Sequence, residues 1–216
     1  MTASAQVGAR VRRARGIRTR ESILRAAVDL ASVEGLEGLS IGRLAQELGM
    51  SKSGLFAHFG SKEELQLAAI DTANEMIIEH VIRPAIANPR GMPRLWSLCS
   101  RWLEHVEKKL FRGGCFFTAA SFEYDSRTGV VRDRIALMMR TWLGTLSRAV
   151  EGARACGHIK ASVDPDQLAF EIETVAIGAF WAFLLLDDQE AMAKARATIL
   201  NRLKSLATPK CPRFAR

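Results

Sequence analysis

The sequence of 216 residues has few of the residues that build disulfide frameworks, metal sites or catalytic centres. Its four cysteines lie far apart and form no C-x-x-C pair, so free thiols in a reducing compartment are expected. The four histidines have no H-x-x-x-H spacing, and neither a nucleophile motif nor a glycine-rich phosphate loop occurs. We therefore expect no catalytic residue, no metal site, no cofactor and no enzymatic activity.

Long apolar runs are also missing. The most apolar run, Val175 to Leu186, covers 12 residues, whereas a helix that crosses a bilayer needs about 20. We interpret this run as a buried helix and expect no membrane partner. The first residues hold no apolar stretch of the kind found in secretory signals, so a cytoplasmic location is expected.

Aromatic residues (7%) and proline (6 residues) are sparse, whereas alanine, leucine and arginine are abundant. This composition favours helices, and no segment alternates apolar and polar residues as a strand does. The expected fold is all-α with about nine helices, a three-helix unit followed by a larger helical domain. The predicted parts are a disordered basic arm (1–18), the three-helix unit (19–64), the larger domain (65–208) and a basic tail (209–216).

Positive charge exceeds negative charge by 8, and seven arginines stand among the first 25 residues against the single acid Glu21. Such an imbalance indicates a polyanionic partner, either nucleic acid or an acidic membrane surface. The arm lacks the bulky apolar residues that a membrane-surface segment needs, which favours nucleic acid.

Serine and glycine mark the starts and ends of three short helices. Ser40, Ser51 and Ser61 are predicted N-caps, and Gly49 and Gly60 end the first two helices. The tight turn at residues 49–51 predicts a large crossing angle between these helices, as in a helix-turn-helix. The second helix then exposes its first turn, and its width suits the major groove of DNA.

The predicted DNA contacts lie on this second helix and beside it. With Leu55 and Phe59 facing the core, its other residues are left for DNA, and the helix starts offer N–H groups for phosphates. The predicted DNA-binding residues are Ser40, Ser51, Lys52, Ser53, Gly54, Phe56, Ala57, His58 and Lys62. A plain three-helix bundle with solvated polar residues is the alternative. The basic arm favours DNA, because such arms can lie in the minor groove.

Residues 20–66 resemble the N-terminal domain of the TetR family of bacterial regulators. The family patterns S/T-x-x-x-I/L-A-x-x-x-G and S-K-x-x-L/I-Y/F-x-H/Y-F-x-S-K-E-x-L are carried here by Ser40, Leu44, Ala45, Gly49, Ser51, Lys52, Leu55, Phe56, His58, Phe59, Ser61, Lys62, Glu63 and Leu65. Phe56 replaces the commoner tyrosine, and Gly54 stands where many members carry threonine, so contacts through these two hydroxyls are lost.

The resemblance implies a homodimer whose two reading helices bind a near-palindromic operator of double-stranded DNA. It also implies a repressor that a small-molecule effector releases from the operator. A DNA-binding regulator or architectural protein without a ligand switch is the alternative.

The helix predicted at 164–186 is apolar on all sides, which a single small domain cannot easily cover. We expect this helix and the last one to form the dimer interface, as the resemblance also implies, with a purely intrachain core as the alternative. The predicted interface residues are Ile172, Val175, Ala179, Phe183, Leu186, Ile199 and Leu203.

Aromatic residues and methionine gather in three other segments, 94–103, 115–122 and 138–142, and such residues can line an apolar pocket. We predict a small apolar effector there, with ordinary core packing as the alternative. The predicted pocket residues are Trp96, Cys99, Trp102, Leu103, Phe116, Phe117, Met138 and Trp142.

Overall fold

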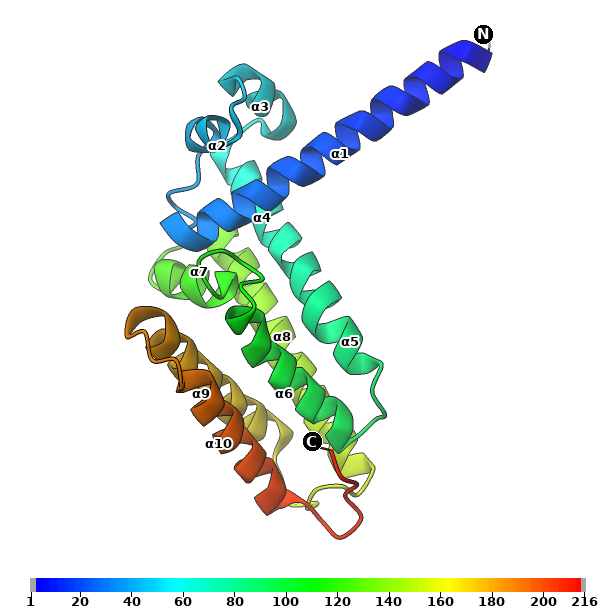
Figure 1. The fold of residues 1–216 in the computed structure, drawn as a ribbon, viewed down its shortest axis with the longest axis vertical. Helices are drawn as coiled ribbons and strands as arrows, with labels where there is room; N and C mark the ends of the chain where they lie inside the picture. Colours follow the sequence, from blue (N-terminus) through cyan, green and yellow to red (C-terminus); the bar gives the residue numbers. More distant parts are fainter. Residues whose placement is uncertain (1–2, 215–216) are drawn as a thin grey trace.

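The computed structural model describes residues 3–214, which form helices joined by loops, with one β-bridge between Ile159 and Ala207. Figure 1 shows a small unit, here called the head, built from α1, α2, α3 and the start of α4. Below it lies an elongated bundle of the remaining helices. The expected all-α fold is confirmed.

The head forms because each short helix has its own start and stop signal. Its helices are α1 (Ala3–Glu34), α2 (Ile41–Leu48), α3 (Lys52–Phe59) and the first turns of α4 (Lys62–Ile77). The hydroxyls of Ser40, Ser51 and Ser61 each accept the backbone N–H three residues later, and each cap contributes about 1 kcal/mol. Gly49 ends α2 in the left-handed conformation, with φ of 62°. The predicted caps are confirmed.

The first helix begins earlier than the sequence indicates. We expected a disordered arm over residues 1–18, followed by the three-helix unit from residue 19, but α1 is continuous from Ala3. The alanines and arginines of this stretch favour the helical backbone even though they form no apolar stripe. Figure 1 shows this part of α1 standing clear of the rest of the chain. Residues 1 and 2 of the predicted arm lie outside the described residues.

One long rod leads from the head into the bundle. It consists of α4, a π turn (Ile78–Ile82) and α5 (Arg83–Ile86). Pro84 explains the π turn, because it lacks the N–H that would bond to the carbonyl of His80 in an α-helix. If this rod is counted as one helix, the described residues form nine helices. The boundary predicted at residue 64 falls in the first turn of α4, so head and bundle share this helix.

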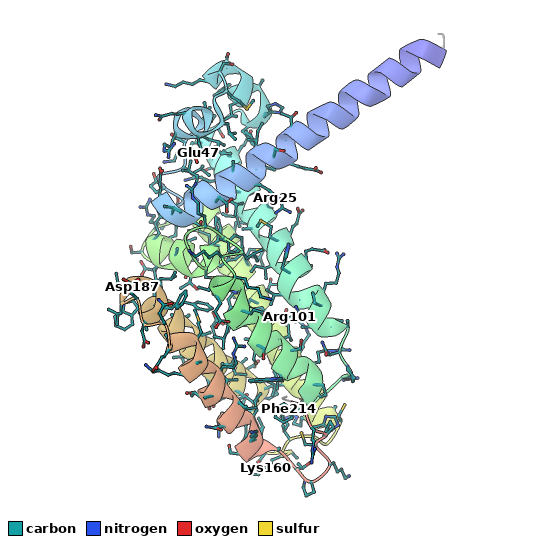
Figure 2. All side chains as sticks on the ribbon, viewed as in Figure 1. Arg25, Glu47, Arg101, Lys160, Asp187 and Phe214 are labelled. Carbon is teal, nitrogen blue, oxygen red and sulfur yellow. The ribbon has the colours of Figure 1, made fainter. Side chains whose placement is uncertain are left out.

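The bundle holds α6 (Met92–Glu107), α7 (Phe116–Tyr124), α8 (Val130–Ala155), α9 (Pro165–Leu185) and α10 (Ala191–Leu206). α8 packs on α9, α9 on α10, and α6 on both α8 and α10. The sequence Asp164-Pro165-Asp166-Gln167 predicts a cap at Asp164, and the structure confirms it, since this carboxylate accepts two backbone N–H groups. The pattern Asp187-x-x-Glu190 likewise predicts that Asp187 caps α10, and this prediction is wrong. Asp187 has a φ of 54° in the preceding turn (Figure 2), and Asp188 accepts the N–H of Glu190 instead.

The segment after α10 folds back onto the bundle. Phe214 meets Trp96 edge-on, with ring centroids 6.3 Å apart, near the start of α6 (Figure 2). Residues 209–214 are therefore docked rather than a free basic tail, because Cys211 and Phe214 pack against the apolar core. Residues 215 and 216 lie outside the described residues.

The loop before α7 touches α1 so closely that only glycine fits. A Cβ on Gly113 would lie 2.0 Å from the backbone oxygen of Ser32. The N–H of Gly113 donates to Ser32 Oγ (2.9 Å), and that of Arg112 donates to Asp29 Oδ1 (3.3 Å). This contact joins the head to the bundle at a second place besides α4.

We expect Gly113→Ala to destabilise the protein by about 1–3 kcal/mol, because the loop and the backbone of α1 must separate. Urea unfolding followed by circular dichroism measures the change. Gly152→Ala in α8 is the matched control, since its Cβ would meet Arg90 at an ordinary 3.5 Å. That variant should be as stable as the wild type or slightly more stable. An unchanged midpoint for Gly113→Ala would contradict the rigid contact.

Candidate functional site

α3 presents the residues predicted to contact DNA. Leu55 and Phe59 are buried in the head, at 0% and 3% exposure, and hold the helix in place. Of the predicted residues on and before α3, five are exposed and two are half-buried: Ser51, Lys52, Ser53, Phe56 and Ala57, then Gly54 and His58. The structure thus gathers these side chains on one protruding helix, as the sequence indicates. The contact with DNA itself stays a prediction.

Two of the predicted phosphate contacts are used as helix caps. The Oγ atoms of Ser40 and Ser51 accept the N–H groups of Arg43 and Gly54, both at 3.1 Å. A serine hydroxyl that accepts one hydrogen bond still has its own O–H to donate, and a phosphate oxygen can accept it. The starts of α2 and α3 also carry the partial positive charge of a helix N-terminus, which favours anions.

Three cationic side chains of the head differ in whether an acidic side chain of the protein pairs with them. Arg43 is held by Glu34 (2.6 Å) and by Glu47 (3.1 Å; Figure 2), so its charge is compensated within the protein. Lys62, a predicted phosphate contact, is bound to Glu37 at 2.7 Å. Lys52 has no ion-pair partner among the described residues. Of these three cations, Lys52 is the one that is ready for a phosphate or a base.

Glu37 connects the head to the bundle. Its carboxylate accepts hydrogen bonds from Lys62 Nζ (2.7 Å) and from the hydroxyl of Tyr124 (2.9 Å), and it pairs with Arg127 (3.1 Å). The bond from Lys62, followed by that from Tyr124, lowers the pKa of Glu37 to about 2. Burial, followed by the bond to Glu37, raises the pKa of Tyr124. This carboxylate is therefore ionised, and the tyrosine protonated, at neutral pH.

The end of α7 also holds the loop between α1 and α2 by its backbone. The two oxygens of Glu123 accept the N–H groups of Leu36 (2.7 Å) and Glu37 (2.8 Å). Gln66, buried in α4, donates both to the carbonyl of Leu36 (2.8 Å) and to Tyr124 (3.1 Å). Any displacement of α7 along its axis must therefore move this loop.

A cavity of about 460 Å³ lies in the bundle. It is surrounded by the α4–α5 rod, α6, α7 and α8, and its wall is mainly apolar. Of the eight predicted pocket residues, Trp102, Phe117, Met138 and Trp142 line it. This volume and this kind of wall are typical of small-molecule sites.

The other four predicted pocket residues do not line the cavity. Cys99, Leu103 and Phe116 are core residues with 1% exposure each, and Trp96 packs on Phe214. They lie on the same helices as the lining residues but on other faces. The prediction selected whole segments of sequence and therefore did not distinguish one face of a helix from another.

Sequence reasoning also missed several lining residues. Ile77, Ile78, Ile82 and Ile86 come from the rod, and the polar members are Asn74, Arg94, Thr141, Thr145 and Arg148. The isoleucines recur at helical spacing and could have been found by that signal. The two arginines carry no such signal, because arginine on a helix is usually a surface residue.

A buried carboxyl group supports the tryptophan wall. Trp142 Nε1 donates to Glu173 Oε2 (2.7 Å), and the rings of Trp102 and Trp142 lie 4.2 Å apart. Burial raises the pKa of Glu173 to about 7, and the indoles of Trp142 and Trp102 act in the opposite direction. Burial also lowers the pKa of His105 to about 4, although its Nδ1 contacts the carbonyl of Trp102.

The structure places four of the seven predicted interface residues in the chain's own core, and the dimer itself stays a prediction. Ile172, Ala179, Ile199 and Leu203 are buried within the chain's own core, Val175 and Phe183 are half-buried, and Leu186 is exposed. The α9 side chains left open to solvent are instead Phe170, Trp181, Leu184, Leu185 and Leu186, at 45% to 68% exposure. The predicted residues of α9 recur at helical spacing, but their side of the helix packs on α8 and α10. α9 has a second apolar side, and that side is the exposed one.

An apolar groove of about 360 Å³ runs between α9 and α10 beside this open face. Among the described helices, α9 alone has a length and apolar composition that would also suit a membrane span. Its packing on α8 and α10 accounts for part of its apolar surface. The rest remains an uncovered surface on the side of the bundle.

A helix-turn-helix with a protruding second helix, joined to a larger helical bundle, is the architecture of a class of DNA-binding proteins. The family models for bacterial regulatory proteins of the tetR family and for the tetracyclin repressor-like C-terminal domain match residues 23–69 and 91–199, respectively. The chain belongs to the TetR family of bacterial transcriptional regulators, and the resemblance seen in the sequence is confirmed.

Individual relatives agree with this assignment. Transcriptional regulator AcuR of Cereibacter sphaeroides is 22% identical over 152 residues, which is 69% of this chain and 68% of that protein. A TetR transcriptional regulator from Chloroflexus aurantiacus J-10-FL has a TM-score of 0.82 at 26% identity, over 89% of this chain and 98% of that chain. AibR, solved with isovaleryl coenzyme A and operator DNA, has a TM-score of 0.67 at 22% identity, over 87% of this chain and 98% of that chain.

The buried carboxyl of Glu173 predicts a specific pH dependence of stability. The native group keeps its proton up to about pH 7, whereas the unfolded group loses it near about pH 4.3. Its contribution is therefore complete below about pH 4.3 and is lost as the pH rises to about 7. The loss is at most about 4 kcal/mol.

Glu173→Gln removes this titration and keeps a side chain that can accept from Trp142. The difference in unfolding free energy between wild type and variant, measured by urea unfolding from pH 4 to pH 8, should shift in favour of the variant as the pH rises. A difference that stays constant over this range would show that Glu173 does not titrate in the folded protein as described.

Proposed function

We propose that this TetR-family regulator is a sequence-specific repressor that acts in the cytoplasm and leaves a palindromic operator when a small molecule binds. DNA-binding regulation of transcription is the function of the family. The observation that supports the release step is a continuous path of contacts from the cavity to the head. It runs through Phe117 at the start of α7 and Tyr124 at its end to Glu37 and Lys62.

The head supplies the contacts with DNA. In the proposed complex α3 enters the major groove, with Lys52 and Phe56 on the exposed side of the helix. The capped starts of α2 and α3 bind backbone phosphates from either side of the groove. Lys62 can add a contact when Glu37 releases it, so the Glu37–Lys62 pair competes with DNA for the same ammonium group.

α7 is proposed to carry the signal of ligand binding. Phe117 lines the cavity in the first turn of α7, and Glu123 and Tyr124 hold the head at its last turn. A ligand that displaces Phe117 displaces this short rigid helix, and with it the loop between α1 and α2. Two heads must be spaced by one helical repeat of DNA to bind together, so a small rotation of each head lowers operator affinity.

A second subunit is proposed to cover the open face of α9 and α10. Large contiguous apolar patches on a soluble protein usually mark an interaction site. The patch lies on the side of the bundle, and its core holds Trp181 and Leu185 at 57% and 68% exposure. Pairing these helices with their copies would form a four-helix interface and present two α3 helices together.

Lys52→Ala and His58→Ala should each weaken operator binding about tenfold, a loss of about 1.4 kcal/mol. The operator is first obtained by selecting bound sequences from a random DNA pool, and affinities are then measured by gel shift. Lys204→Ala is the matched control, because Lys204 is an exposed lysine at the far end of α10. Wild-type affinity in both head variants, with a palindrome still selected, would contradict the proposed reading helix.

Trp181→Glu combined with Leu185→Glu should convert the dimer into a folded monomer. Both side chains are exposed in the single chain, so the substitutions leave the chain's own core intact and put charges into the interface. Sedimentation velocity measures the oligomeric state, and circular dichroism checks the fold. Phe56→Glu, which charges an equally exposed aromatic residue in the head, should stay dimeric. A double variant that remains dimeric would place the interface elsewhere.

A further inference from the structure

Two arginines face the cavity without a counter-charge. Arg94 from α6 and Arg148 from α8 are both lining residues, and the lining contains no aspartate or glutamate. Neither arginine forms an ion pair with any described residue. Arg134 and Arg154 of α8 are paired, with Asp71 and Glu151, whereas the exposed Arg140 forms no ion pair among the described residues. What distinguishes the cavity is that two arginines share one lining that contains no acidic side chain.

Neutral groups hold both guanidinium groups in place. Arg94 donates through Nε and Nη2 to the carbonyl of Asn88, at 3.2 and 3.0 Å, which leaves Nη1 without a partner among the described residues. Arg148 donates to Thr145 Oγ1 at 3.0 Å, and Thr145 itself lines the cavity. Arg94 is half-buried and Arg148 is exposed at the rim. The partly desolvated guanidinium of Arg94 gains most from an anion that can accept two parallel hydrogen bonds.

The rest of the wall suits an apolar body. Trp102, Phe117 and Trp142 present aromatic surface, and methionine and isoleucine side chains complete it. The one buried acid nearby, Glu173, is bound to the Trp142 indole and is not a lining residue. It therefore does not neutralise the arginines within the cavity.

We propose that the cavity binds an amphipathic organic anion, with its acid group at Arg94 and Arg148 and its apolar body against the aromatic wall. This inference rests on the proposed function, because it names the chemical class of the effector. It differs from the sequence-based expectation of a small apolar effector, because it adds an acid group to the apolar body. A carboxylate and a phosphate share the required chemistry, and the test below separates them.

The test compares acids with matched neutral and cationic compounds on the full-length protein. Octanoate and 3-phenylpropionate are titrated against their primary amides, together with octyl phosphate and octylamine, by calorimetry and tryptophan fluorescence. Each carboxylate should bind at least tenfold more tightly than its amide, and octylamine should bind most weakly. The ratio of octyl phosphate to octanoate affinity identifies the preferred acid group.

Charge-removing variants locate the acid group. Arg94→Met and Arg148→Met should each lower the affinity for octanoate about tenfold and leave the affinity for octanamide unchanged. Arg140→Met is the matched control, because Arg140 is an exposed arginine of α8 that does not line the cavity. Unchanged octanoate binding in both cavity variants would overturn the assignment of these arginines.

Two further outcomes separate this inference from the proposed function. Equal binding of acids and amides would overturn the anion proposal while leaving a ligand-binding cavity. No binding by any of these compounds, or by the uncharged dye N-phenyl-1-naphthylamine, would overturn both the anion proposal and the ligand switch. DNA binding by the head is measured separately by the gel shift.

Discussion

The carboxylate of Glu37 is the point on which the arrangement of head and bundle depends. It binds the start of α4 through Lys62, the end of α7 through Tyr124, and the following loop through Arg127. A single exposed ion pair contributes only about 0–1 kcal/mol. The effect of the three together is geometric, because one position of the carboxylate satisfies all of them. The angle of α3 relative to the bundle is thereby tied to the position of α7.

The cavity lies at the other end of α7 from Glu37. Phe117 belongs both to the cavity wall and to α7, whereas Trp102 and Trp142 form a wall backed by the buried carboxyl of Glu173. The hydrogen bond to Glu173 restricts the orientation of the Trp142 indole in this wall. The α7 side is therefore the side expected to yield to a ligand, and it is also the side that is joined to the head.

Charge is used differently in the two parts of the molecule. In the head, acids compensate Arg43 and Lys62, whereas Lys52 on α3 forms no ion pair among the described residues. In the bundle, Arg94 and Arg148 line the cavity without an acidic partner, and the proposed anion would supply the opposite charge. The net excess of 8 positive charges over the chain does not distinguish these cases. The position of each acidic side chain relative to each cation is what distinguishes a paired cation from an unpaired one.

The sequence by itself determined α2, α3, the start of α4 and their caps, because an N-cap serine and a terminal glycine act on residues only three or four positions away. It also determined the family, since the pattern from Ser40 to Leu65 lies within these local elements. The tertiary structure decided which faces of α6, α8 and α9 meet. Helical periodicity shows that a face is apolar but not whether a neighbouring helix, a ligand or a second subunit covers it. For that reason Ile172 belongs to the core, Trp181 to the open face and Arg148 to the cavity.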